Sequence, residues 1–122
     1  MASNRAFRVG PVAMSATLTT DIFSPAAAGS GTGYTPSASY AIIKHIRIVN
    51  KTAGAVTFSL WLGASGGNAA GTEVVGIGVS IPANDYFDWY GQMRINSGEY
   101  LVGGASAGTS LSITLEGEVG LA

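Results

Sequence analysis

Apolar and polar residues alternate along several short segments of the chain, a pattern that predicts β-strands. In residues 55–62 the apolar positions are Val56, Phe58, Leu60 and Leu62. In residues 109–119 they are Leu111, Ile113 and Leu115. Because successive side chains of a strand point to opposite faces, each segment is expected to bury one face and expose the other.

The most apolar segment, residues 40–50, carries polar groups on both of its faces. One face is expected to hold Ile42, Lys44, Ile46 and Ile48, and the other Ile43, His45, Arg47 and Val49. We therefore expect a strand that is buried on one side and in contact with something on the other.

Further strands are predicted at 15–23, 73–81, 85–91 and 99–105, separated by turns rich in small residues. Residues 24–39 are a loop by composition, and residues 1–14 are expected to form an extended N-terminal arm because Gly10 and Pro11 interrupt any regular element. We therefore predict an all-β chain, with a single antiparallel β-sandwich of about seven or eight strands over residues 15–122. Jelly-roll and immunoglobulin-like topologies both fit this pattern.

Composition points to a subunit covered by neighbours. Of 122 residues, 47% are hydrophobic and only 11% are charged, against about 25% charged residues in ordinary soluble domains. The six basic residues are scattered, so we expect no contact with nucleic acid. No signal peptide and no long apolar span are recognisable, so we expect no membrane contact.

No constellation suited to catalysis stands out. His45 is the single histidine, there is no cysteine, and Asp85 and Asp88 are expected on opposite faces of one strand. A lone histidine on a strand is more often a surface or interface group than a general base. We therefore predict a protein that is not an enzyme and binds no cofactor and no metal.

Aromatic residues are the best functional lead. In the DYFDWY segment, alternation separates Tyr86, Asp88 and Tyr90 from Phe87 and Trp89, so one aromatic set faces the core and the other is left for contact. Trp61 lies on the polar side of its strand. The predicted contact residues are Arg5, Phe7, Arg8, Phe23, Tyr34, Trp61, Tyr86, Trp89 and Tyr90. A sugar-binding platform would use the same aromatic residues.

From Ile43 to Ala122 the chain resembles small bacteriophage virion proteins. The matching segments are IKHIRIVNKTAGAVTFSLWLG, SIPANDYFDWYG and SGEYLVGGASAGTSLSITLEGEV. They form a strand ending at Asn, a small-residue hairpin, an I-P-A-N turn and a closing strand near Gly-Glu. The N-terminal third matches less closely.

The resemblance implies a function that the pattern alone does not. Proteins of this type decorate capsids, commonly as trimers that clamp neighbouring capsid subunits, or are minor tail and baseplate components. We expect a capsid decoration protein, made in the host cytoplasm and located on the virion, whose partner is the major capsid protein. The expected clamping elements are residues 1–14 and 24–39. A tail or baseplate protein and a carbohydrate-binding module for host adsorption are the alternatives.

Overall fold

A computed structural model of the chain describes residues 5–25 and 38–121. These residues form eight β-strands, and no helix occurs within the described ranges. The strands are β1 (Arg5–Ala13), β2 (Asp21–Phe23), β3 (Ala38–Asn50), β4 (Val56–Gly63), β5 (Val79–Ile81), β6 (Tyr86–Asn96), β7 (Tyr100–Ala105) and β8 (Leu111–Leu121).

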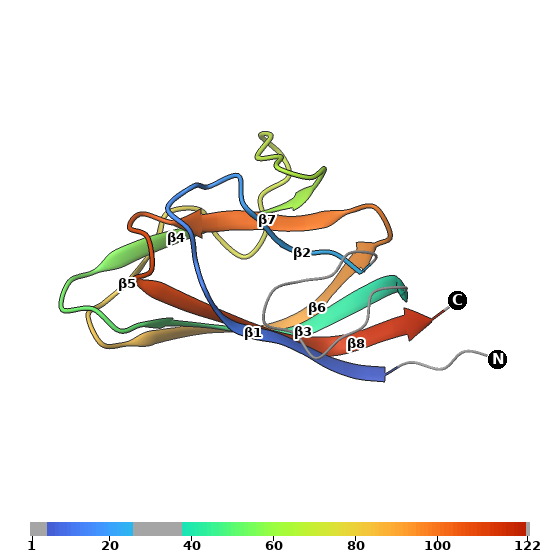
Figure 1. Ribbon diagram of the computed structural model, residues 1–122, viewed down its shortest axis with the longest axis horizontal. Coiled ribbons are helices and arrows are strands. Elements are labelled where there is room, and N and C mark those ends of the chain that lie inside the picture. Colours follow the sequence, from blue (N-terminus) through green and yellow to red (C-terminus); the bar gives the residue numbers. More distant parts are fainter. Residues whose placement is uncertain (1–4, 26–37, 122) are drawn as a thin grey trace.

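The strands pair as if one long hairpin had been folded over on itself. Strand β1 pairs with β8, β2 with β7, β3 with β6 and β4 with β5, all antiparallel. Pairing of β3 with β8 and of β4 with β7 completes two four-stranded sheets, sheet A (β1-β8-β3-β6) and sheet B (β2-β7-β4-β5). The sheets form the two layers of Figure 1. The predicted β-sandwich is confirmed, and this nested order is that of a jelly roll rather than an immunoglobulin-like fold.

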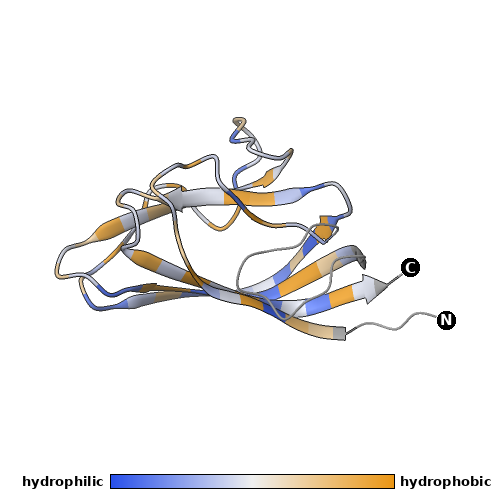
Figure 2. Ribbon diagram, viewed as in Figure 1, coloured by the Kyte–Doolittle hydropathy of each residue, from blue (hydrophilic) through white to orange (hydrophobic). Residues whose placement is uncertain are grey.

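The core lies between the two sheets and is filled by alternate residues of the strands. Figure 2 shows hydrophobic and polar positions interchanging along β3, β4 and β8. The largest fully buried side chains are Phe23, Phe58, Ile43, Ile46, Ile48, Leu60, Ile81, Ile95, Leu101, Leu111, Ile113 and Leu115. The expected inward faces of residues 55–62 and 109–119 are therefore confirmed.

The N-terminal segment belongs to the sandwich. Residues 1–14 were expected to be an extended arm, and the described part is extended, but Arg5–Ala13 form an edge strand of sheet A. Phe7 and Val9 are buried in the core. A truncation of residues 1–10 would therefore remove core side chains as well as any clamp.

Two predicted strands are shorter than expected. Residues 15–23 yield only β2, because the chain before it turns where the Thr20 N–H donates to the Thr17 carbonyl at 3.2 Å. Residues 73–81 yield only β5. Val75 has a φ of 63° and Gly78 a φ of 61°, and this left-handed backbone cannot continue a strand. The predicted 24–39 loop lies mostly outside the described residues.

Strand β3 contains a β-bulge that changes which of its residues face the core. Its register against both neighbouring strands shifts between Ile43 and His45. Lys44 and His45 consequently point to the same, outer side, and Ile43 rather than Ile42 is fully buried. The predicted division of this strand into two faces is correct after the bulge and wrong before it, because an inserted residue shifts the alternation by one.

Asn50 joins two turns at one end of the sandwich. Its side chain is buried, and its amide nitrogen lies 2.9 Å from the Gly54 carbonyl oxygen, 3.0 Å from that of Ile81 and 3.2 Å from that of Pro82. Its Oδ1 accepts from the backbone N–H and the hydroxyl of Thr52. One side chain thus holds together the β3–β4 hairpin and the turn that precedes β6.

Candidate contact surface

Three of the predicted contact residues are buried and cannot form a surface. Phe7 and Phe23 stack on each other at 5.1 Å between ring centroids, inside the core. Trp61 is only 7% exposed although it lies on the outer side of sheet B. The segment from Thr72 to Gly76 runs alongside β4 at the edge of the sheet, with the Leu62 N–H donating to the Thr72 carbonyl at 2.9 Å.

Four further predicted contact residues have different locations. Arg5 pairs through its backbone with Val119 on β8, and Arg8 is exposed on β1. Tyr34 lies outside the described residues. Trp89 is half-buried and packs against the core, so in the DYFDWY strand Phe87 and Trp89 form the inward set.

Tyr86 and Tyr90 are the exposed aromatic residues among the predicted contact residues, at 56% and 70%. Both lie on the outer face of sheet A, on the edge strand β6. The ring of Tyr90 stacks on the imidazole of His45, with centroids 4.5 Å apart and planes 5° from parallel. The guanidinium of Arg47 lies 4.8 Å from the centroid of the Tyr86 ring. Each tyrosine is therefore supported on one ring face by a side chain of β3.

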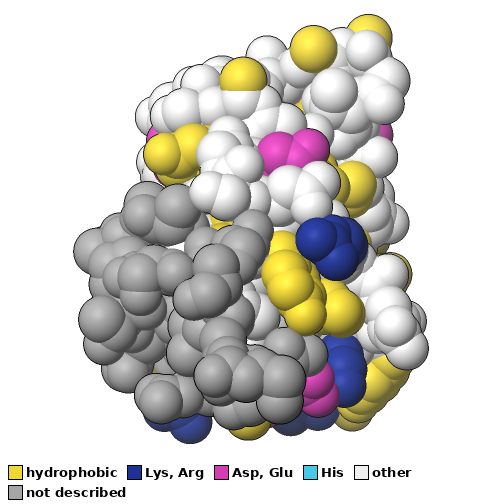
Figure 3. Space-filling view, turned by 90° about the vertical axis from the view of Figure 1, so that its right-hand side faces the viewer, with side chains coloured by type: hydrophobic (Ala, Val, Ile, Leu, Met, Phe, Trp, Pro, Cys, Tyr) yellow, Lys and Arg dark blue, Asp and Glu magenta, His cyan; other side chains and the backbone are white. Residues whose placement is uncertain are grey.

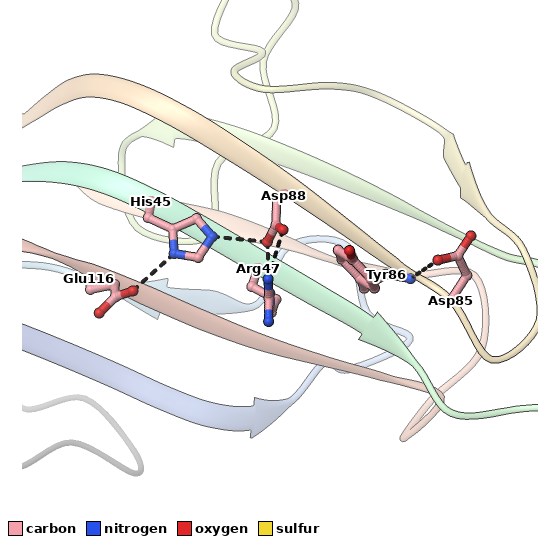
Figure 4. Close-up of polar contacts among 6 residues, drawn as sticks. All are labelled: His45, Arg47, Asp85, Tyr86, Asp88 and Glu116. Atoms are coloured by element: carbon pink, nitrogen blue, oxygen red, sulfur yellow. Dashed lines mark hydrogen bonds and ion pairs between the residues drawn. The ribbon is translucent and has the colours of Figure 1, made fainter.

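Asp88 lies between the two tyrosines and connects the side chains that support them. Its Oδ1 accepts from Arg47 Nε at 2.8 Å and its Oδ2 from the second Arg47 nitrogen at 2.9 Å. The same Oδ1 lies 2.9 Å from His45 Nε2, and His45 Nδ1 lies 2.9 Å from Glu116 Oε1 on β8. Figure 4 shows these side chains converging from β3, β6 and β8. We call the set Tyr86, Tyr90, His45, Arg47, Asp88 and Glu116 the outer sheet surface.

The hydrogen bonds of this surface change the pKa values of its members. The hydrogen bond to Glu116, aided by Asp88, raises the pKa of His45 above 6.5 against the opposing effect of burial. The hydrogen bonds from Arg47, and then from His45, lower the pKa of Asp88 from 3.8 to about 2. Asp88 also raises the pKa of Arg47 above its usual range. These shifts favour the charged forms, which make the strongest hydrogen bonds.

The geometry suits recognition better than proton transfer. Both ring nitrogens of His45 face carboxylates, so neither is directed at a hydroxyl that it could activate. Among the described residues, no group of three or more His, Cys, Asp or Glu side chains is arranged to hold a metal ion. Nor does any helix in the described ranges have the length and hydropathy to cross a membrane.

Figure 3 views the end of the sandwich that lies on the right in Figure 1, where a few basic and acidic side chains lie among hydrophobic and uncharged ones. The charged groups of the outer sheet surface are paired with one another across strands, and Lys44 on β3 pairs with Glu118 on β8 at 2.8 Å. This pairing leaves the two tyrosine rings as its most exposed apolar groups.

Sequence reasoning found the exposed tyrosines but not the cluster beneath them. His45, Arg47, Asp88 and Glu116 come from three strands, and only the strand register brings them together: His45 pairs with Tyr90 and Glu116, and Arg47 with Asp88. The one available signal was the polar residues on the otherwise apolar β3 segment. A scan of known protein families and a search of curated proteins found nothing that matches this chain.

The titration of this cluster gives a pH-dependent stability. Because its folded pKa is raised, His45 stabilises the fold fully below pH 6.5 and loses that contribution as pH rises through the folded pKa. Because its folded pKa is depressed, Asp88 stabilises the fold above pH 3.8 and loses that contribution as pH falls toward 2. We expect urea unfolding to show a fall in stability from pH 6 to 8 that is reduced in His45→Gln. An equal fall in both proteins would contradict this assignment.

Proposed function

We propose that this chain is a non-enzymatic structural subunit of a bacteriophage particle, a capsid decoration protein that binds the major capsid protein. The observation that carries the proposal is the outer sheet surface, where Tyr86 and Tyr90 are exposed yet held in place by Arg47 and His45. Tyrosine and arginine are enriched among the residues that dominate binding energy at protein interfaces. Because these rings are already ordered, docking against them costs little side-chain entropy.

Two further features support this proposal. The jelly roll is an architecture of viral capsid and lectin domains, although a fold by itself does not determine function. The low content of charged residues favours a subunit whose surface is largely covered by neighbouring subunits. The proposed partners are virion proteins, the proposed location is the capsid surface after synthesis in the host cytoplasm, and nucleic acid and membranes are not among the proposed partners.

The location is tested on intact particles. Particles of the phage that encodes this chain would be purified, probed with an antibody to the chain and imaged by electron microscopy. Labelling distributed over the head supports a decoration protein. Labelling confined to the tail or baseplate supports the alternative structural role, and particles that lack the chain would refute both.

The outer sheet surface is tested by substitution. We expect Tyr90→Ala to weaken binding to undecorated heads by roughly 30-fold, since removal of a central interface residue costs about 2 kcal/mol. Ile77→Ala is the matched control, because Ile77 is an exposed apolar residue, at 48%, in the segment between β4 and β5. Equal binding of both variants in a sedimentation assay would mean that this surface does not contact the capsid.

Carbohydrate binding is the second candidate, and one observation favours it. Tyr90 stacks on His45 through one ring face and is 70% exposed, and a supported aromatic ring of this kind can stack on a sugar. The buried Trp61 cannot take part. Glycan-array binding that disappears in Tyr90→Ala and persists in Ile77→Ala would favour this role over capsid decoration.

A further inference from the structure

Strand β6 is the longest edge strand of the two sheets. Open sheet edges invite pairing with another chain, and proteins normally guard them by shortness, proline or irregularity. Strands β2 and β5 have three residues each, and β1 contains Pro11 and a register shift between Val9 and Val12. Strand β6 has 11 residues and no proline, and within the described ranges it pairs with β3 alone, with one register shift between Tyr90 and Met93.

Backbone hydrogen bonds at its ends show which β6 residues face the open edge. The carbonyl of Asp85 accepts from Asn50 at the end of β3, so odd-numbered residues point toward β3. The N–H groups of Tyr86 and Asn96 are bonded instead by the carboxylates of Asp85 and Glu99. By alternation, the backbone groups of residues 88, 90, 92 and 94 are directed to the open edge.

The side chains of β6 are complementary to those of a second β6 running in the opposite direction. If the two strands cross at Gly91, Asp88 of each copy lies opposite Arg94 of the other, and Tyr90 lies opposite Gln92. The backbone N–H and C=O groups of these residues point to the open edge. They would therefore form the hydrogen bonds between the two β6 strands. Shifting the register by two residues in either direction places Asp88 opposite Gln92 or Asn96 and loses both charge pairs.

The inward side of the edge fits the same register. Phe87, Trp89 and Met93 pack against the core but are only half-buried. With the crossing at Gly91, Trp89 faces Met93 of the other copy, so half-buried apolar residues meet each other. A glycine at the axis leaves room between the strands for the Trp89 ring, which lies against the side-chain position of Gly91.

We propose that two copies of this chain pair antiparallel along β6, about a two-fold axis at Gly91, and join their four-stranded sheets into one continuous sheet. The self-complementary charges and the half-covered apolar edge identify a second copy as the occupant. Because of the two-fold axis, each contact occurs twice, so every complementary pair contributes twice to the stability of the dimer. The proposed dimer differs from the trimer that the resemblance to decoration proteins implies.

The mass of the purified chain tests the dimer without any particle, so its failure would leave the proposed capsid contact untouched. Sedimentation equilibrium should give a dimer, and Arg94→Glu should weaken it roughly 10- to 100-fold, because two attractive pairs become repulsive. Arg94→Lys keeps the charge and should remain dimeric. Circular dichroism would verify that both variants are folded. A monomer or a trimer of the natural chain, or equal masses for the two variants, would overturn the proposal.

Cross-linking tests the register independently. The chain has no cysteine, so a mixture of Tyr90→Cys and Gln92→Cys chains carries one thiol on each side of the proposed axis. Directly opposed residues of a hydrogen-bonded antiparallel pair have Cα atoms about 5.5 Å apart, within the range that a disulfide can span. Oxidation should link the two variants into a covalent heterodimer, whereas a mixture of Leu18→Cys, an exposed position away from β6, with Gln92→Cys should stay largely unlinked. Equal linking in both mixtures would refute the crossing at Gly91.

Discussion

Replacement of Asn50 by alanine is expected to destabilise the fold by about 3 kcal/mol. The side chain is 1% exposed and makes hydrogen bonds to Gly54, Ile81, Pro82 and Thr52. Alanine leaves these backbone groups without their partner in a place that water reaches poorly. Thermal unfolding followed by circular dichroism should show a midpoint lowered by roughly 10 °C.

Asn68→Ala is the control for this substitution. Asn68 is exposed in the loop between β4 and β5, so its removal should change stability by no more than about 0.5 kcal/mol. Asn50→Asp keeps an acceptor for Thr52 but loses the donors, and should be nearly as unstable as Asn50→Ala. An Asn50→Ala protein as stable as Asn68→Ala would show that the two turns are held by other contacts.

Replacement of Gly117 by alanine is the second substitution with a large expected effect. Gly117 lies opposite Ile43, beside the bulge of β3, and an added methyl group would overlap the carbonyl oxygen of Ile42. Because that oxygen belongs to the backbone, β3 and β8 must move apart, at a cost of about 2 to 3 kcal/mol. The shift should also disturb the neighbouring contact between His45 and Glu116.

Two measurements would check this expectation. Urea unfolding gives the loss of stability, and the NMR titration of His45 reports its contact with Glu116, so Gly117→Ala should lower the histidine pKa toward 6.5. Gly54→Ala is the matched control, since nothing lies within 4 Å of its added methyl group. An unchanged His45 titration in Gly117→Ala would show that the bulge does not influence the contact between His45 and Glu116.

The layers of the fold could be read from the sequence because alternation follows directly from strand geometry. Residues 55–62 and 109–119 bury the expected faces for this reason. The bulge in β3 could not be foreseen, since Lys44 carries no local signal that an extra residue is accommodated there. Nor could the shortening of the predicted 73–81 strand be foreseen, since Val75 near its start adopts a left-handed conformation that valine disfavours and only its surroundings can impose.

The candidate surface was partly predictable for a related reason. The period of two separated Tyr86 and Tyr90 from Phe87 and Trp89, but burial decided which set was exposed. Trp61 was misjudged because alternation places it on the outer side of β4, whereas its side chain is only 7% exposed. The pairing of His45 and Arg47 with Asp88 depends on strand register, which is a property of the whole sheet.

The nested pairing of the strands also constrains the order in which the protein can be completed during synthesis. Strand β8 is synthesised after the other seven described strands, yet it lies between β1 and β3 in sheet A. Until it is inserted, β1 has no partner in the sheet and one side of β3 is an unpaired edge. Because these contacts join the two ends of the chain, closing them is slow compared with forming local hairpins. A chain that lacks β8 would therefore expose unpaired backbone groups on β1 and β3, and we expect such incomplete chains to aggregate.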